Sequence, residues 1–210
     1  MAPASHVPFS PPSGARRAAR QPRGAQHGVT LIELMVVLAI AAIVLWQAVP
    51  NFREFVARNR LDGAAQAMLV SLQIARSEAM RRGEQVTMRL SGAAGSRNWG
   101  GGWIAFVDGN RNGELDADEE IVIEQAALTS PLSLFSSSSF DTTVAFSRDG
   151  RLTGAGGVFV VCEGGVLTED GRSRSRAVVV NGAGRARMAA RNASEVPLTD
   201  SGVVTSCSNP

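Results

Sequence analysis

The chain has 210 residues, of which 44% are hydrophobic and 19% charged, so it can form one globular core beside a membrane segment. All 21 basic residues are arginines; with 19 acids they give a net charge of +2, which identifies no partner. Both histidines, His6 and His27, precede residue 28. The remainder has neither the commonest general base nor a phosphate-loop motif, which argues against an enzyme.

Residues 29–49 form an apolar run long enough to cross a bilayer, since 21 residues of helix span about 32 Å. The segment before it contains four arginines and no acid, which predicts a cytoplasmic N-terminus; these are Arg16, Arg17, Arg20 and Arg23. An ordinary signal anchor shares these features. A secretory signal peptide fits less well, because the run is too long and no small-residue cleavage site follows it.

One carboxylate, Glu33, lies five positions into the apolar run. A charge at the centre of a membrane helix costs about 3 kcal/mol, and less near its end. A cut after Gly28 would create an amine at Val29, and in an assembly this amine could neutralise Glu33 of a neighbouring subunit. In an isolated chain, Glu33 could instead stay hydrated at the membrane surface.

The sequence GVTLIE at residues 28–33 resembles the N-methylation motif of type IV pilins. The resemblance implies that a prepilin peptidase cuts after Gly28 and methylates Val29, that Glu33 serves assembly, and that Pro50 bends the helix. A leader of 28 residues is long for a pilin. Either the start codon lies further along the chain, or the leader is extended and disordered.

These features predict a removed leader (1–28), a transmembrane helix (29–49), an amphipathic continuation of that helix (50–83) and a β-rich domain (84–210). An apolar stripe at steps of three and four predicts helix to about Arg82, with Gly83 as its C-cap. The stripe consists of Phe52, Phe55, Val56, Met68, Leu72, Ala75 and Ala79.

After Gly83 the apolar period changes to two, which predicts strands. Seven are expected, at 85–90, 102–107, 120–127, 131–135, 142–147, 157–162 and 176–181. Segments rich in glycine or serine predict loops at 91–98, 136–139, 153–157 and 164–175. The expected fold class is α+β: a long N-terminal helix packed on an antiparallel sheet or small β-sandwich, as in pilins.

Two stretches, ARSEAMRRGEQVTMRL (75–90) and NWGGGWIAFVDGNRNGELDADEEIV (98–122), resemble the FimT/GspH branch of minor pilins and pseudopilins. The resemblance implies a non-enzymatic subunit near the tip of a type IV pilus or a type II secretion pseudopilus. Its partners would be other pilins, met through the N-terminal helix, and the prepilin peptidase. It would cross the bacterial inner membrane once, with its C-terminal domain in the periplasm.

The chain has two cysteines, Cys162 and Cys207. Outside the inner membrane the surroundings are oxidising, so a disulfide is expected, and closing this loop would stabilise the fold by roughly 4 kcal/mol. Two buried free thiols are the alternative. Without histidines nearby, the pair is a poor metal site.

An acidic stretch, DGNRNGELDADE (108–119), matches the spacing of a calcium-binding loop. The candidate ligands are Asp108, Asn110, Asn112, Asp116 and Glu119. The flanking sequence predicts strands rather than the helices of an EF-hand, and Asn-Gly sequence also forms hairpin turns without an ion. A solvated turn is therefore the favoured interpretation, and calcium, the one cofactor considered, is the alternative.

Residues 171–194 contain six arginines and no acid: Arg172, Arg174, Arg176, Arg185, Arg187 and Arg191. Within GRAR (184–187), Arg185 and Arg187 would point to one side of an extended segment and could hold successive phosphates. A solvated strand end is the plainer interpretation. FimT-like proteins of transformable bacteria carry a similar G-R-x-R motif implicated in binding DNA during uptake, so the resemblance favours weak, sequence-independent binding of double-stranded DNA. The alternative is a structural pseudopilin for protein secretion that binds no DNA.

Overall fold

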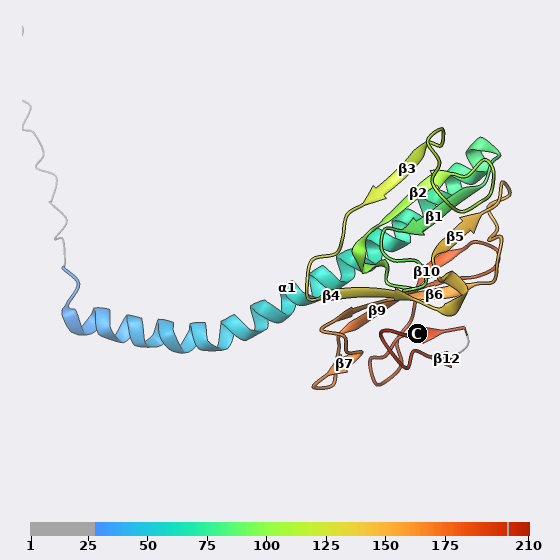
Figure 1. Cartoon of the computed structure of the whole chain (residues 1–210). Coiled ribbons are helices and arrows are strands. Elements are labelled where there is room, and N and C mark those ends of the chain that lie inside the picture. The colour runs from blue at the N-terminus through green and yellow to red at the C-terminus, as the bar shows by residue number, and fades with distance from the viewer. Residues whose placement is uncertain (1–27, 201) are drawn as a thin grey trace, which may run out of the picture. The chain divides into compact units, whose positions relative to one another are not determined.

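The computed structural model describes residues 28–200 and 202–210; the predicted leader, apart from Gly28, lies outside them (Figure 1). Helix α1 runs from Leu31 to Arg82 without a break at Pro50. The chain forms two compact units that divide after Trp46. In the first unit the described part of α1 is almost entirely exposed, and α1 contains one stretch long and apolar enough to cross a membrane.

The helix begins after Thr30, whose hydroxyl accepts the backbone N–H of Glu33 at 3.2 Å. This is the bond that an N-cap threonine makes to the third helical residue. Glu33 is exposed in the first turn of α1, where a carboxylate is favoured by the helix dipole.

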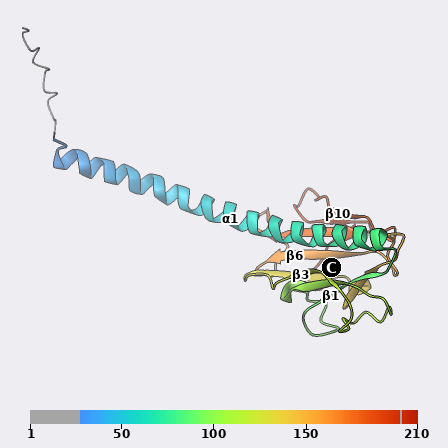
Figure 2. The same ribbon diagram turned by 90° about the horizontal axis from the view of Figure 1, so that it is seen from above.

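In the second unit, one face of α1 lies against the strands (Figure 2). Its buried side chains are Leu61, Ala64, Ala65, Met68, Leu72, Ala75 and Ala79. The lower part of the predicted stripe is therefore confirmed. The upper part of the stripe is helical as predicted, but the expectation that it also packs on the sheet is wrong. Phe52 and Phe55 are 66% and 61% exposed, and the core covers the helix only from Leu61 onward. Gly83 ends the helix at φ +71°, as predicted, and donates to the carbonyl of Ala79 at 3.0 Å.

Two four-stranded antiparallel sheets follow, which confirms the α+β prediction (Figure 1). The first has the order β3-β2-β1-β5: Ile121–Gln125, Trp103–Val107, Val86–Leu90 and Thr143–Phe146. The second has the order β10-β9-β6-β4: Ala186–Met188, Ser175–Val180, Gly157–Glu163 and Leu132–Ser136. All seven predicted strands are present, with ends shifted by one or two residues.

The short elements were not predicted. Segment 164–175, expected to be a loop, contains a small hairpin of β7 (Thr168–Glu169) and β8 (Arg172–Ser173) and the first residue of β9. Two further strands, β11 (Leu198–Thr199) and β12 (Gly202–Val203), pair near the C-terminus. Two 3₁₀ turns occupy Trp99–Gly101 and Ser138–Phe140. Segments of two or three residues are too short to show a period.

One main core joins α1 to both sheets, and Trp99, Trp103 and Phe159 are fully buried in it. A second apolar cluster covers the other side of strands β6 and β9; it consists of Val158, Val160, Cys162, Ala177, Val179, Val204 and Cys207. Burial on both faces explains why these strands read as continuous apolar runs.

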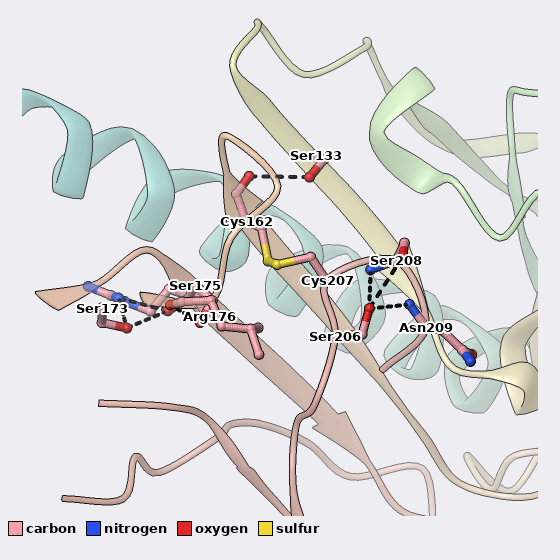
Figure 3. The surroundings of a disulfide bond; sticks show 10 residues. Ser133, Cys162, Ser173, Ser175, Arg176, Ser206, Cys207, Ser208 and Asn209 are labelled. Atoms are coloured by element: carbon pink, nitrogen blue, oxygen red, sulfur yellow. Dashed lines mark hydrogen bonds between the residues drawn. A yellow bond between two sulfur atoms is a disulfide. The ribbon is translucent and has the colours of Figure 1, made fainter. Parts of the chain in front are cut away.

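The predicted disulfide is present between Cys162 in β6 and Cys207 in the C-terminal segment (Figure 3). It lies within the second cluster, beside β4, where the Ser133 hydroxyl donates to the Cys162 carbonyl at 3.4 Å. The bond therefore holds the C-terminal segment against the outer face of the second sheet.

Candidate functional site

The six arginines of segment 171–194 do not form one unopposed patch. Although the segment has no acid in sequence, acids from elsewhere in the chain reach five of the six. The ion pairs are Arg172–Glu54, Arg174–Glu163, Arg174–Glu169, Arg176–Asp62, Arg187–Asp200 and Arg191–Glu195. Arg185 forms no ion pair with any described residue.

The arginines also separate in space. Arg172, Arg176 and Arg191 line one cavity of about 480 Å³, together with the acids Asp62 and Glu195. The Arg176 side chain is only 11% exposed and donates to Asp62 on α1, so it joins the helix to the second sheet. These three arginines are largely satisfied within the fold.

GRAR begins in a tight turn between β9 and β10. The Gly184 N–H donates to the Asn181 carbonyl at 2.8 Å, and the Arg185 N–H donates to the Asn181 side-chain oxygen at 3.0 Å. Arg185 and Arg187 are exposed, whereas Ala186 and Met188 are half-buried against the main core. The alternation places both arginines on the outward side, as expected for an extended segment.

A second turn, SRDGR at residues 147–151, lies against the GRAR turn. The Leu152 N–H donates to the Gly182 carbonyl at 3.2 Å. From α1, Arg76 donates through Nε to the Gly150 carbonyl at 2.9 Å. Two turns more than 30 residues apart in sequence are thereby held together at one corner of the domain.

This second turn adds cations that the sequence analysis missed. Arg148 and Arg151 are exposed and form no ion pair with any described residue. We call Arg76, Arg148, Arg151, Arg185 and Arg187 the two-turn arginine cluster. Its signal in the sequence was weak, because nothing in SRDGR shows that this turn meets GRAR.

The acids at this corner are few. The pKa of Asp149 is lowered, first by the hydrogen bond from the Ser147 hydroxyl and then by the backbone N–H of Arg151. Asp149 therefore stays ionised and shapes its own turn. Asp200 pairs with Arg187, but both side chains are more than half exposed, and such pairs contribute only about 0–1 kcal/mol. A phosphate could replace Asp200 as the partner of Arg187 at little cost.

The predicted calcium ligands all lie in the loop between β2 and β3. Asn110 and Asn112 both donate to Asp116, at 2.7 and 2.9 Å. Glu119 accepts the N–H of Gly109 at the start of the loop, at 3.0 Å. The structure thus brings these four residues together around the turn, and Asp108 lies buried at its base.

The processing and assembly residues lie around the start of the helix. Gly28 and Val29 precede α1 and are exposed, and Glu33 is in its first turn. Their roles in processing and in assembly stay predictions.

Comparison with known proteins identifies the family. Residues 64–184, more than half of the chain, match the model of the type II transport protein GspH, and residues 23–46 match the prokaryotic N-terminal methylation motif. The pilin-like protein PilA1 of Thermus thermophilus is 36% identical over 97 residues, which are 45% of this chain and 56% of PilA1. The match thus spans little more than half of that relative.

Among solved structures, the type IV minor pilin FimU of Pseudomonas aeruginosa has a TM-score of 0.54 at 24% identity, covering 73% of this chain and 98% of FimU. The minor pseudopilin EpsH of Vibrio cholerae aligns at 13% identity with a TM-score of 0.43, covering 62% of this chain and 97% of EpsH. The fold is thus shared with the minor pilin FimU, and the matched family and fold are those of pilins rather than enzymes. The chain belongs to the GspH family and is a minor pilin or pseudopilin of a type IV pilus or type II secretion system.

Proposed function

We propose that this minor pilin is held in the bacterial inner membrane by the apolar part of α1, with its β-rich domain in the periplasm. A prepilin peptidase removes residues 1–28 and methylates the amine of Val29. In the filament, near its tip, Glu33 pairs with the amine of a neighbouring subunit. Pro50 bends the helix, so that it packs against the helices of neighbouring subunits. The two-turn arginine cluster then binds double-stranded DNA for uptake.

The observation that carries the DNA proposal is the position of Arg185. It is exposed, forms no ion pair with a described residue, and lies on a turn packed against the turn of Arg148 and Arg151. Exposed guanidinium groups bind phosphate oxygens with two parallel hydrogen bonds. A small group of them fixed on rigid turns is suited to the sugar–phosphate backbone.

The cluster also predicts the kind of binding. Contacts to phosphates carry no base information, so the binding is sequence-independent. A few phosphate contacts imply a dissociation constant on the order of 10⁻⁴ to 10⁻⁶ M at physiological salt.

The test is fluorescence anisotropy of labelled double-stranded DNA with the processed protein, which lacks residues 1–28, in neutral detergent. Arg185→Ala/Arg187→Ala and Arg148→Ala/Arg151→Ala are both expected to weaken binding by about tenfold or more. The matched control is Arg172→Ala/Arg191→Ala, which removes the same charge from the same sequence segment but from the cavity that also contains Asp62 and Glu195. Equal weakening by all three variants would show that net charge, and not this corner, governs binding.

A structural role in protein secretion without DNA binding is the second candidate. The pairing of five of the six sequence-predicted arginines with acids favours it, because those arginines already have partners within the fold. No DNA binding by the folded, oxidised wild type at low salt would establish this candidate over the first.

A further inference from the structure

The loop between β2 and β3 holds an arrangement of oxygens that the filament role does not use. Its turn is made by Arg111 and Gly113, at φ +62° and +73°. The Asn110 side-chain oxygen accepts the Asn112 N–H at 3.0 Å, and the Asn112 side-chain oxygen accepts the Glu114 N–H at 2.7 Å. The loop's own backbone therefore fixes these oxygens in place.

Asp108, the first residue of this loop, is fully buried. Its Oδ2 accepts three hydrogen bonds: from the Thr87 hydroxyl at 2.6 Å, the Gln85 amide at 3.0 Å and the Gly113 N–H at 3.1 Å. The bond from Gly113 shows that the carboxylate lies against the curl of the loop. Its other oxygen, Oδ1, is equally buried and receives no hydrogen bond from any described residue. Buried polar atoms are almost always satisfied, so an orphaned carboxylate oxygen requires an explanation.

The ion pairs of the other acids near this loop also distinguish Asp108, Asp116 and Glu119. Glu114 contacts Arg89 at 3.4 Å, and Glu120 is held by Arg82 at 2.6 Å. By contrast, Asp108, Asp116 and Glu119 form no ion pair with a described arginine. The two acids with arginine partners, Glu114 and Glu120, stand outside the side-chain ligand positions of a calcium loop, whereas the acids at positions 1, 9 and 12 have none. Asp118, at position 11, also forms no ion pair with a described residue.

The remaining candidate ligands lie close to one another. Glu119 accepts the N–H of Gly109 at 3.0 Å and that of Asp116 at 3.1 Å, so its carboxylate joins the beginning and the end of the loop. As the side chains stand, no three His, Cys, Asp or Glu groups among the described residues are placed to hold a metal, so the carboxylates of Asp108, Asp116 and Glu119 must close around an ion together with the amide oxygens. The oxygen set here mixes carboxylates with amides, which suits calcium better than a transition metal. A cavity of about 480 Å³ lies beside the loop and is lined in part by Asn110 and Glu119, although Asp108 does not line it and becomes accessible only when the loop opens.

We propose that loop 108–119 binds one calcium ion, with Oδ1 of Asp108 as its anchoring ligand. Asn110, Asn112, Asp116 and Glu119 supply the other side-chain oxygens. The flanking elements are strands β2 and β3, so the site is a calcium loop set in a β-hairpin and not an EF-hand. The ion compensates the buried charge of Asp108 and fixes the hairpin that lies beside the end of α1.

The test is calorimetric titration of chelator-treated, full-length protein in neutral detergent with calcium chloride, together with a melting curve. We expect one ion per chain, a dissociation constant of roughly 10⁻⁶ to 10⁻³ M, and a higher melting temperature with calcium. Magnesium chloride should bind more weakly, because magnesium demands a more regular set of six ligands.

Two variants of one loop make the test specific. Glu119→Gln should weaken calcium binding at least tenfold. Asp118→Asn removes the same charge from the adjacent exposed residue and should leave binding within about twofold of wild type. Asp108→Asn is less informative, because it also disturbs the bonds to Thr87 and Gln85. Absence of both heat and a melting shift at about 10 mM calcium, or equal weakening by the two variants, would overturn the proposal.

Discussion

Gly184 lies so close to Gly150 that a Cβ added to Gly184 would come within 2.0 Å of the Gly150 carbonyl oxygen. Gly184 also has φ +75°, and Gly150 has φ +78°. The two glycines let the GRAR and SRDGR turns approach at backbone distance. The contact therefore determines where the arginines of the two-turn arginine cluster lie relative to one another.

Gly184→Ala should separate these turns. We expect a loss of about 1–3 kcal/mol in the free energy of unfolding, from the unfavourable φ and the clash with backbone. DNA binding should weaken several-fold even though no charge is removed. Gly182→Ala is the control, because a Cβ there meets nothing within 4 Å and its effect should stay within about 0.5 kcal/mol. Equal effects of the two substitutions on thermal melting would contradict the close contact between Gly184 and Gly150.

Glu33→Gln tests the assembly role. The variant should be processed normally, giving a mass that lacks residues 1–28, but its content in purified filaments should fall about tenfold. The reason is that an unneutralised subunit amine in the apolar core of a filament is costly. Thr30→Val separates this role from helix capping, because it removes the Thr30–Glu33 bond and keeps the charge. Normal filament content of Glu33→Gln, or an equal loss with Thr30→Val, would count against the pairing.

Removal of the disulfide should loosen the second apolar cluster before the main core. Cys162→Ser/Cys207→Ser is expected to lower the free energy of unfolding by roughly 3–4 kcal/mol, because the bond closes a loop across a sequence separation of 45. Limited proteolysis should then cut between residues 189 and 210 earlier than in wild type. Cleavage at an unchanged rate would mean that the apolar contacts of Val204 hold this segment by themselves.

Glu78 predicts a pH effect on stability. Hydrogen bonds from Arg81 and then Arg82 lower its pKa from 4.5 to about 2. Because the folded-state pKa is the lower one, the stabilisation is complete above about pH 4.5 and is lost as the pH falls toward 2. Arg82 also binds Glu120, whose pKa it lowers, so the network joins the end of α1 to the start of β3.

Glu78→Gln should therefore melt at a lower temperature than wild type at pH 7, and the difference should shrink between pH 4.5 and 2. The measurement is a series of thermal melts across this range. Glu84→Gln, which removes an exposed acid just beyond α1, is the control and should show no such convergence. A difference that stays constant down to pH 2 would argue against the network.

Much of this fold followed from local pattern. The change of period from 3.6 to two at Gly83 located the end of α1 and seven of the eight strands of the two sheets, because each period reports which face of an element is buried. Strand β10, with three residues, was too short to be predicted. The exposure of Phe52 and Phe55 could not be read from the stripe. Apolar spacing shows a face, but whether anything covers that face depends on where the strands reach.

The candidate site was only half predictable. Arg185 and Arg187 were found because they lie two positions apart in one short motif. Arg148 and Arg151 belong to the same corner through the contact of Gly150 with Gly184 and the hydrogen bond of Leu152 to Gly182, which are long-range consequences of the topology. The same limitation applied to the acids: Glu54 and Asp62 neutralise Arg172 and Arg176 from more than 100 residues away.

The proposal that the two-turn arginine cluster binds double-stranded DNA is tested most directly by the salt dependence of that binding. For the processed protein, which lacks the four leader arginines, in neutral detergent, the logarithm of the association constant should fall linearly with the logarithm of salt concentration, with a slope of about −0.9 per phosphate contact. Arg185→Ala/Arg187→Ala should reduce the magnitude of that slope by about two, and Arg172→Ala/Arg191→Ala should leave it unchanged. An unchanged slope in the first variant, or no binding by the wild type at low salt, would contradict the account.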